Sequence, residues 1–242
     1  WHYLLSGRAN ADEWFAQMSG GTESAFAGDF TLAPYVQKLH ANHIQLKRGL
    51  ASFLIQTPLR RDPFAIYYSW ASVNAATLSD VFLAPQDGCA ALVEFCYLHG
   101  FDSTFVTPGS LNNLKDRKLL FLPGVCSLSD DEVRVLRDFA KRGGKLYADS
   151  EPGVLDGFLA RRSEPPLKGL WTKYSRTAGE DELKAILATA GVVQTESFSG
   201  VGKWQAMLRT RQLGDMKCVG FTCHSKEVGK RVVVGLGRDG YI

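Results

Sequence analysis

The sequence lacks a surplus of charge of either sign. Its 242 residues include 28 lysines and arginines against 25 aspartates and glutamates, a formal net charge of +3. Nucleic-acid and acidic-membrane surfaces need clustered positive charge, so this balance predicts neither partner. No apolar run approaches the roughly 20 residues that a membrane-spanning helix requires. No secretory signal opens the chain, and the sequence assigns no cellular compartment.

Metal-binding spacings are also missing. The sequence has no CxxC and no HExxH motif, and His40 and His43, three residues apart, have no third donor in view. We therefore expect no metal and no cofactor. The five cysteines stand mostly in apolar contexts, which is typical of small buried thiols. An initiating methionine is absent as well, and we interpret the chain as a piece of a longer protein.

What the sequence does contain, from residue 61 onward, is an alternation of strand and helix patterns. The run "FAIYYSW" (64–70) is continuously apolar, as in a strand covered on both faces. Further strands are predicted at 101–107, 117–124 and 145–149, and helices at 89–100, after Ser129, and at 180–191. Ser129 and Glu132 form a capping box, and Gly143 and Gly144 end that helix. The alternation predicts an α/β fold, a flavodoxin-like parallel sheet with helices on both faces.

The segments on either side of this block follow other patterns. Residues 1–60 read as a helical lead-in, with a helix opened by Pro34. Residues 156–176 read as a loop around Pro165 and Pro166. Strand patterns at 203–213, 217–223 and 230–237, separated by short turns, predict a small antiparallel β element. We therefore divide the chain into a lead-in (1–60), an α/β domain (61–195) and a β element (196–242).

Two stretches carry a family resemblance: "DPFAIYYSWASVNA" and "KLLFLPGVCSLSDDEVRVLRDFAKRGGKLYADSEPGVLDG". In order and spacing they resemble the class I glutamine-amidotransferase-like domain of multidomain glycoside hydrolases. The type is the middle, or trimerisation, domain of family 42 β-galactosidases. The resemblance implies a structural domain that follows a catalytic (β/α)₈ barrel of the same parent chain and supports a homo-oligomer or the rim of the active site. It also places the catalytic carboxylates on that barrel, so this sequence does not predict the substrate of the parent enzyme.

A nucleophile elbow is the main catalytic alternative. In the amidotransferases a cysteine sits between glycines after a strand, and Ser150 falls at that position, while Ala148 and Pro152 replace the glycines. Proline has no N–H to donate and restricts the residue before it. His224 is the only histidine downstream, and the His-x-Glu partner motif is absent. We predict that Ser150 caps a turn and that this domain has no catalytic residue.

Two further hypotheses stay open. Cys126 precedes a helix start, where an exposed thiol would have a lowered pKa. A Ser- or Cys-dependent hydrolase would need Ser150 Oγ or Cys126 Sγ within hydrogen-bond reach of a histidine. Alternatively, exposed aromatic rings could stack on sugars and make the domain a carbohydrate-binding module. The aromatic candidates near loops and strand ends are Trp70, Trp171, Tyr174 and Trp204.

Overall fold

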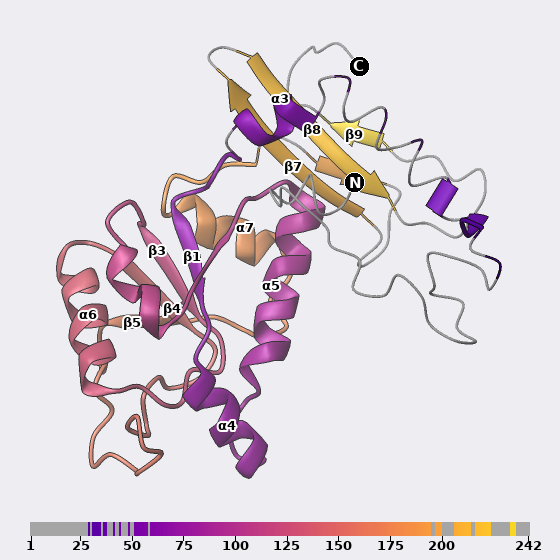
Figure 1. Ribbon diagram of the computed structural model, residues 1–242. Helices are drawn as coiled ribbons and strands as arrows, with labels where there is room; N and C mark the ends of the chain where they lie inside the picture. The colour runs from indigo at the N-terminus through magenta and orange to yellow at the C-terminus, as the bar shows by residue number, and fades with distance from the viewer. Residues whose placement is uncertain are drawn as a thin grey trace. The chain divides into compact units, whose positions relative to one another are not determined.

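The structure is a computed structural model that describes residues 29, 31–34, 36–37, 41, 44, 48, 51–57, 59–194, 197–199, 206–213, 216–223 and 233–235. The chain divides into two compact units (Figure 1). One contains residues 1–60 and 209–222, and the other contains residues 61–208 and 223–242. The α/β fold lies within the second unit. The predicted division at residues 60 and 195 stays a prediction.

Five parallel strands form the sheet of this unit. They are β1 (Phe64–Tyr67), β2 (Thr104–Val106), β3 (Leu119–Leu122), β4 (Lys145–Ala148) and β5 (Trp171–Lys173). Their order, β2-β1-β3-β4-β5, is that of a flavodoxin-like doubly wound sheet, whose switch point lies between β1 and β3. The predicted α/β fold is confirmed.

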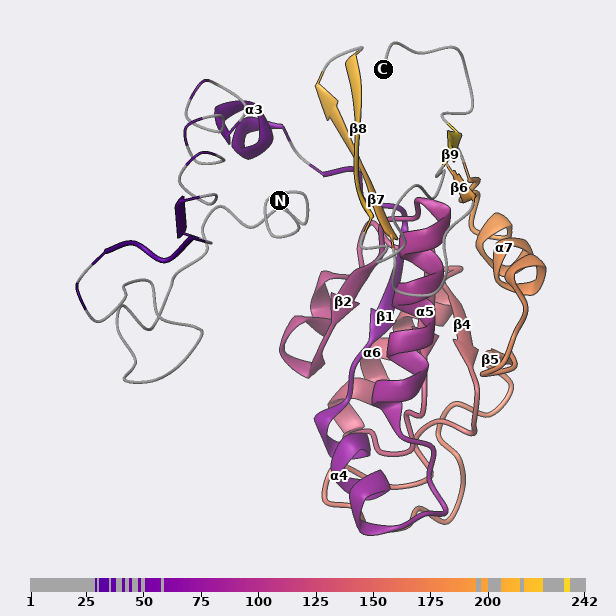
Figure 2. The same ribbon diagram turned by 90° about the vertical axis from the view of Figure 1, so that its right-hand side faces the viewer.

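Helices cover both faces of the sheet, and successive residues of each strand pack alternately against the helices of one face and of the other. In β1, Phe64 and Ile66 face α5 (Pro85–His99) and α7 (Glu180–Ala188), whereas Ala65 and Tyr67 face α6 (Asp130–Lys141). We call these the α5–α7 face and the α6 face. The short helix η2 (Pro108–Asn113) also packs on the α6 face. In Figure 2, β2 and β5 lie at opposite sides of the sheet, with α5 in front of it.

The capping box predicted for α6 is present. Ser129 Oγ accepts a hydrogen bond from the backbone N–H of Glu132 (3.3 Å), and Glu132 Oε2 accepts one from the N–H of Ser129 (2.6 Å). The hydroxyl of Tyr67 donates to the other carboxylate oxygen of Glu132, so the cap also ties α6 to β1. At the other end, Gly143 has φ +90°, and a Cβ on Gly144 would lie 2.4 Å from the ring of Phe139. Both ends of α6 are therefore set by local sequence.

Three predicted boundaries were wrong. Trp70 does not end a strand: β1 stops at Tyr67, and Trp70 opens α4 (Trp70–Leu78), because Ser69 Oγ accepts from the N–H of Ser72 (3.1 Å) and caps that helix. Residues 156–176 are not all loop, since β5 adds a short edge strand there. Helix α5 also begins earlier than predicted, with Pro85 in its first turn.

The remaining elements are short. Helix α3 (Ala51–Gln56) covers the end of the predicted lead-in helix, and Leu59 bridges to Arg211. Strands β7 (Ala206–Leu213) and β8 (Met216–Cys223) pair across two intervening residues, a spacing that only antiparallel neighbours allow. Strand β6 (Ser197–Ser199) pairs antiparallel with β9 (Val233–Gly235). Among the described helices, none has the length and apolar character to cross a membrane.

Candidate functional site

The carboxyl edge of the sheet is where a doubly wound fold places its sites, and Asp149 lies there, directly after β4. Its side chain is fully buried. Oδ1 accepts from the N–H of Gly124 (2.7 Å), and Oδ2 accepts from Nε of Arg176 (2.8 Å) and lies 2.7 Å from Nη2 of the same guanidinium. This ion pair neutralises the buried carboxylate, and the contacts of Asp149 join β4, the end of β3 and the segment after β5. Asp149 therefore holds the edge together and is not free to act as a base.

Ser150 follows Asp149 and is half-buried. Its Oγ lies 3.4 Å from Asp149 Oδ1, an oxygen that already accepts from Gly124. The one histidine among the described residues is His99, in the last turn of α5. Because α5 links two parallel strands, it returns to their amino ends, opposite the edge where Ser150 lies (Figure 1). The described residues thus give Ser150 no histidine, and His224 lies outside them.

Cys126 lies in the loop after β3, among Ala75 of α4 and Leu155. It is buried, and burial raises the pKa of its thiol above the ordinary value. Its Sγ lies 4.0 Å from the carbonyl oxygen of Ser72. A neutral, enclosed thiol of this kind is a small core residue and lacks the features of an activated nucleophile. Cys89 is similar: burial raises its pKa to about 12.

The aromatic candidates divide into exposed and buried rings. Trp70 is 62% exposed and packs edge-on against Tyr68, with ring centroids 5.2 Å apart. Trp171 is half-buried, and its Nε1 donates to Glu151 (3.3 Å). Tyr174 is only 3% exposed, and its ring packs in the core of the α5–α7 face. The proposed stacking role of Tyr174 on sugar is therefore corrected, because its ring has no open face. Trp204 lies outside the described residues.

The carboxyl edge carries a set of exposed apolar side chains, of which only Trp70 was predicted from the sequence. They come from α4, from the segment between α4 and α5, and from the turn after Asp156, and we call them the carboxyl-edge patch. Large apolar residues are individually common on surfaces, but several at one end of a domain mark an interaction surface. The stretch "TLSDVFLAP" was the available signal, an apolar loop with one charge. The members of the patch are Trp70, Leu78, Val81, Leu83 and Phe158.

The turn that presents Phe158 is held firmly. Asp156 Oδ1 accepts from the N–H groups of Phe158 (2.8 Å) and Ala160 (2.9 Å). Leu159 adopts φ +67°, a left-handed conformation that costs a non-glycine residue free energy, and it packs against Leu155 and its neighbours. Phe158 is 95% exposed at the tip of this turn. Exposure of a phenylalanine to water costs free energy, so a turn that holds Phe158 exposed suggests that this side chain has a functional role.

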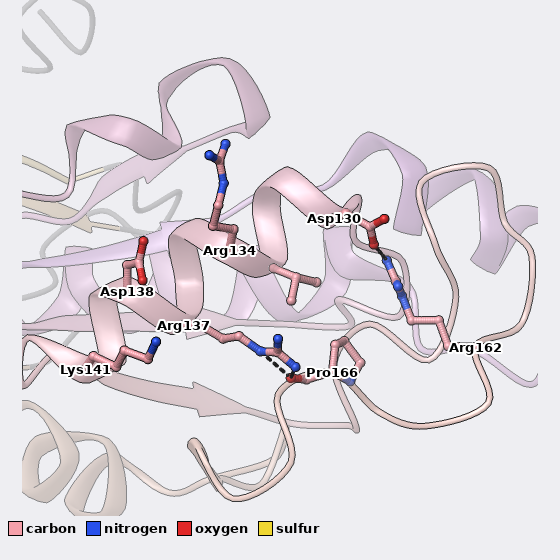
Figure 3. Close-up of a pocket in the computed structure, with 8 residues that line it drawn as sticks. Asp130, Arg134, Arg137, Asp138, Lys141, Arg162 and Pro166 are labelled. Carbon is pink, nitrogen blue, oxygen red and sulfur yellow. Dashed lines mark hydrogen bonds and ion pairs between the residues drawn. The ribbon is translucent and has the colours of Figure 1, made fainter.

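A basic hollow of about 350 Å³ runs along the outer side of α6 (Figure 3). Three of its cations are already engaged, and the first of them, Arg134, pairs with Asp131 (2.8 Å). Arg162 pairs with Asp130 (2.7 Å), and Arg137 donates twice to the carbonyl oxygen of Pro166 (3.0 and 2.7 Å). In Figure 3 the Arg134 side chain points away from Pro166. The hollow is therefore the place where the loop before β5 packs against α6 and is bonded to it.

The second cavity is a groove of about 550 Å³ between α5 and the segment from Tyr174 to Leu183, and we call it the α5–α7 groove. Its floor is apolar and includes Leu92 and Phe95. Burial raises the pKa of the Tyr174 hydroxyl well above its ordinary value. At the amino-edge end, His99 Nε2 lies 3.1 Å from Glu180, and burial lowers the pKa of this histidine. Among the described residues, no cluster of three or more metal-ligating side chains occurs.

No family model and no curated protein matches the sequence. Solved structures do match. The apo exo-carrageenase GH42 from Bacteroides ovatus has a TM-score of 0.56 at 18% identity, over 77% of this chain and 26% of that chain. The β-galactosidase from Rahnella sp. R3 has 0.54 at 15%, over 86% and 30%. The β-galactosidase from Marinomonas ef1 has 0.51 at 13%, over 75% and 38%.

Identities this low describe the fold alone. The chain spans between about a quarter and two fifths of the length of each of these structures. The family 42 resemblance carried by the two sequence stretches is thus supported at the level of fold. The chain shares the fold of one part of chains that include a GH42 exo-carrageenase and β-galactosidases.

Proposed function

We propose that this chain is a non-catalytic structural domain of a multidomain glycoside hydrolase, of the amidotransferase-like, trimerisation type. In this role it supports assembly of the parent enzyme or the rim of its active site. The observation that carries the proposal is the carboxyl-edge patch. Domains that stand alone rarely keep several large apolar side chains at one end, whereas domains that are covered by a neighbour do so regularly.

The shape of the patch supports this role. Phe158 is presented by a turn that Asp156 fixes, so little conformational entropy would be lost when a partner covers it. Trp70 stands at the first residue of a capped helix, which fixes its backbone in the same way. Rigid aromatic anchors surrounded by smaller apolar groups are typical of the centre of a protein interface. The occupant that fits the proposal is a preceding catalytic barrel or a second copy of the chain.

The side chains at the carboxyl edge fit a domain that has no catalytic role. The only carboxylate directly after β4 is neutralised by Arg176, the Cys126 thiol is buried, and Ser150 has no histidine among the described residues. A glycoside hydrolase needs two carboxylates facing a sugar, and the proposal assigns these to the barrel of the parent.

Association measurements test the proposal. Sedimentation velocity over a wide concentration range should show self-association, or binding to the purified remainder of the parent, through an interface of at least about 1,000 Å². Phe158→Asp should weaken that association by at least about ten-fold, because it buries a charge at the centre of the interface. Val193→Asp, a change at another exposed apolar residue that follows α7, is the matched control and should have no effect.

Two results would contradict the proposal. One is a chain that stays monomeric and also ignores the rest of its parent. The other is a full reading frame that encodes no (β/α)₈ barrel with two strand-end carboxylates.

A further inference from the structure

The α5–α7 groove has the properties of a ligand site that the proposed structural role does not explain. Its volume of about 550 Å³ falls within the range of about 300–1,000 Å³ that is usual for small-molecule sites. One wall is helix α5, and the other is the connection from β5 to α7 together with the first turn of α7. An apolar floor with a few polar groups along it is the usual composition of such a site.

Tyr174 supplies the first of these polar groups. The residue is 3% exposed, and its hydroxyl is buried without a hydrogen-bond partner among the described residues. A buried hydroxyl left unpaired costs about 1–3 kcal/mol, and native proteins rarely retain one. The ring is held by the core, with its centroid 5.4 Å from that of Phe121, so the hydroxyl cannot turn elsewhere. A donor or acceptor on a ligand would complete it.

Glu94 supplies the second. Its Oε1 is buried and has no hydrogen-bond partner in the described part of the chain. Two other charged groups along the groove form ion pairs, Arg176 with Asp149 and His99 with Glu180, although Arg176 Nη2 and His99 Nε2 have no hydrogen-bond partner in the described part of the chain. Among its described lining residues, the groove therefore holds one carboxylate, that of Glu94, without an ion-pair partner, and each of its cations is already paired with a carboxylate. An anionic ligand would be repelled, and a ligand with O–H or N–H donors would be favoured.

We propose that the α5–α7 groove binds a small, hydroxyl-rich ligand that carries no negative charge, of the size of one or two sugar rings. Its hydroxyls pair with Tyr174 and Glu94, while its C–H face lies on Leu92 and Phe95. At the mouth, Ser175 Oγ and Thr177 Oγ1, 3.1 Å apart, offer further hydroxyl contacts. A purely apolar ligand would leave both buried oxygens unpaired, which is why hydroxyls are required.

A matched pair of sugars tests the ligand class. Galactose and galacturonate share one ring and differ by a carboxylate. In ligand-observed saturation-transfer NMR on the full 242-residue chain, galactose should give a signal that saturates at millimolar concentration. Galacturonate should bind at least about five-fold more weakly, because its carboxylate faces Glu94. Silence with galactose, or equal binding of the two sugars, would overturn the proposal.

Matched variants test the location. Ala91 is an exposed α5 residue that lines the groove, whereas its exposed neighbour Ala90 does not. Ala91→Trp should fill the groove and reduce galactose binding by at least about ten-fold, while Ala90→Trp leaves it unchanged. Tyr174→Phe removes one hydroxyl and should weaken binding about three- to ten-fold.

If Ala91→Trp fails to fold, Tyr174→Phe still tests the site, provided that this variant melts at no lower temperature than the wild-type chain. Equal losses in the two tryptophan variants, or full binding by Tyr174→Phe, would place the sugar elsewhere and refute the site. None of these results depends on whether the chain self-associates.

Discussion

The two faces of the central sheet are packed in different ways. The core of the α6 face is mainly aliphatic, with Tyr67 and Phe139 as its buried rings. The core of the α5–α7 face contains six buried aromatic residues: Phe64, Phe95, Phe101, Phe121, Tyr147 and Tyr174. Flat rings prefer edge-to-face or offset packing, and Phe64 and Phe121 pack edge to face with an interplanar angle of 87°. The aromatic face is also the one with the α5–α7 groove.

The largest difference in the free energy of unfolding should come from breaking the arginine–aspartate ion pair of each face. Arg176→Met leaves the Asp149 carboxylate buried without its cation and should lower the free energy of unfolding by about 3–5 kcal/mol. Asp130→Asn breaks the pair with Arg162 on the α6 side, where the Asp130 side chain is 89% exposed, and should cost less than about 0.5 kcal/mol. Urea denaturation measures both. Similar losses of unfolding free energy in the two variants would contradict the structural role assigned to the buried Asp149–Arg176 ion pair.

The next contrast is between two leucines. Leu136 is fully enclosed on the α6 face, and Leu136→Ala should cost about 3–4 kcal/mol, since the loss includes an unfilled cavity. Leu183 borders the α5–α7 groove, where water can enter the space that its side chain vacates. Leu183→Ala should therefore cost only about 2 kcal/mol. Equal losses in urea titrations would mean that the groove is closed in solution.

Two buried tyrosines differ by a single hydrogen bond. The Tyr67 hydroxyl donates to the carboxylate of Glu132, and Tyr67→Phe should cost about 1.5–3 kcal/mol. The Tyr174 hydroxyl has no partner among the described residues, so Tyr174→Phe removes an unpaired buried group and should stabilise the ligand-free protein by up to about 1–3 kcal/mol. Thermal and urea unfolding of the ligand-free protein compare them. A large loss in Tyr174→Phe would show that its hydroxyl is already satisfied.

The smallest effect concerns His99 at the end of the groove. Burial lowers its pKa from the ordinary 6.5, so the unfolded chain takes up this proton more readily than the folded one. Stability from this residue is therefore present above pH 6.5 and is lost as the pH falls through the lowered pKa. His99→Gln should flatten this part of the pH dependence of unfolding by up to about 1 kcal/mol. Glu180→Gln should steepen it, because Glu180 raises the pKa of His99.

Local sequence determined much of the fold. Strands β1 and β3 are buried on both faces and read as unbroken apolar runs, and the Ser129 capping box marks the start of α6. Strand β5 was missed because it is a three-residue edge strand whose residues are exposed or half-buried. Its pairing with β4 comes from tertiary structure and leaves no periodic signal.

The candidate functional sites were harder to predict from the sequence than the fold. The elbow at Ser150 was recognisable as a strand end, and its missing glycines gave reason to expect no catalysis there. Tyr174 was noticed as an aromatic residue near a loop, but its burial depends on α5 and α7 meeting over it. The carboxyl-edge patch and the groove need residues from distant segments to come together, which no single stretch of sequence encodes.

The two glycines that end α6 have a consequence for how the chain can evolve. Gly143 has φ +90° with open space around it, so its requirement is a backbone conformation. Gly144 is required because any side chain would collide with Phe139 of its own helix. The first position can drift to asparagine at modest cost, whereas the second can change only together with Phe139. In a population of related sequences, one glycine would vary alone and the other only as half of a correlated pair.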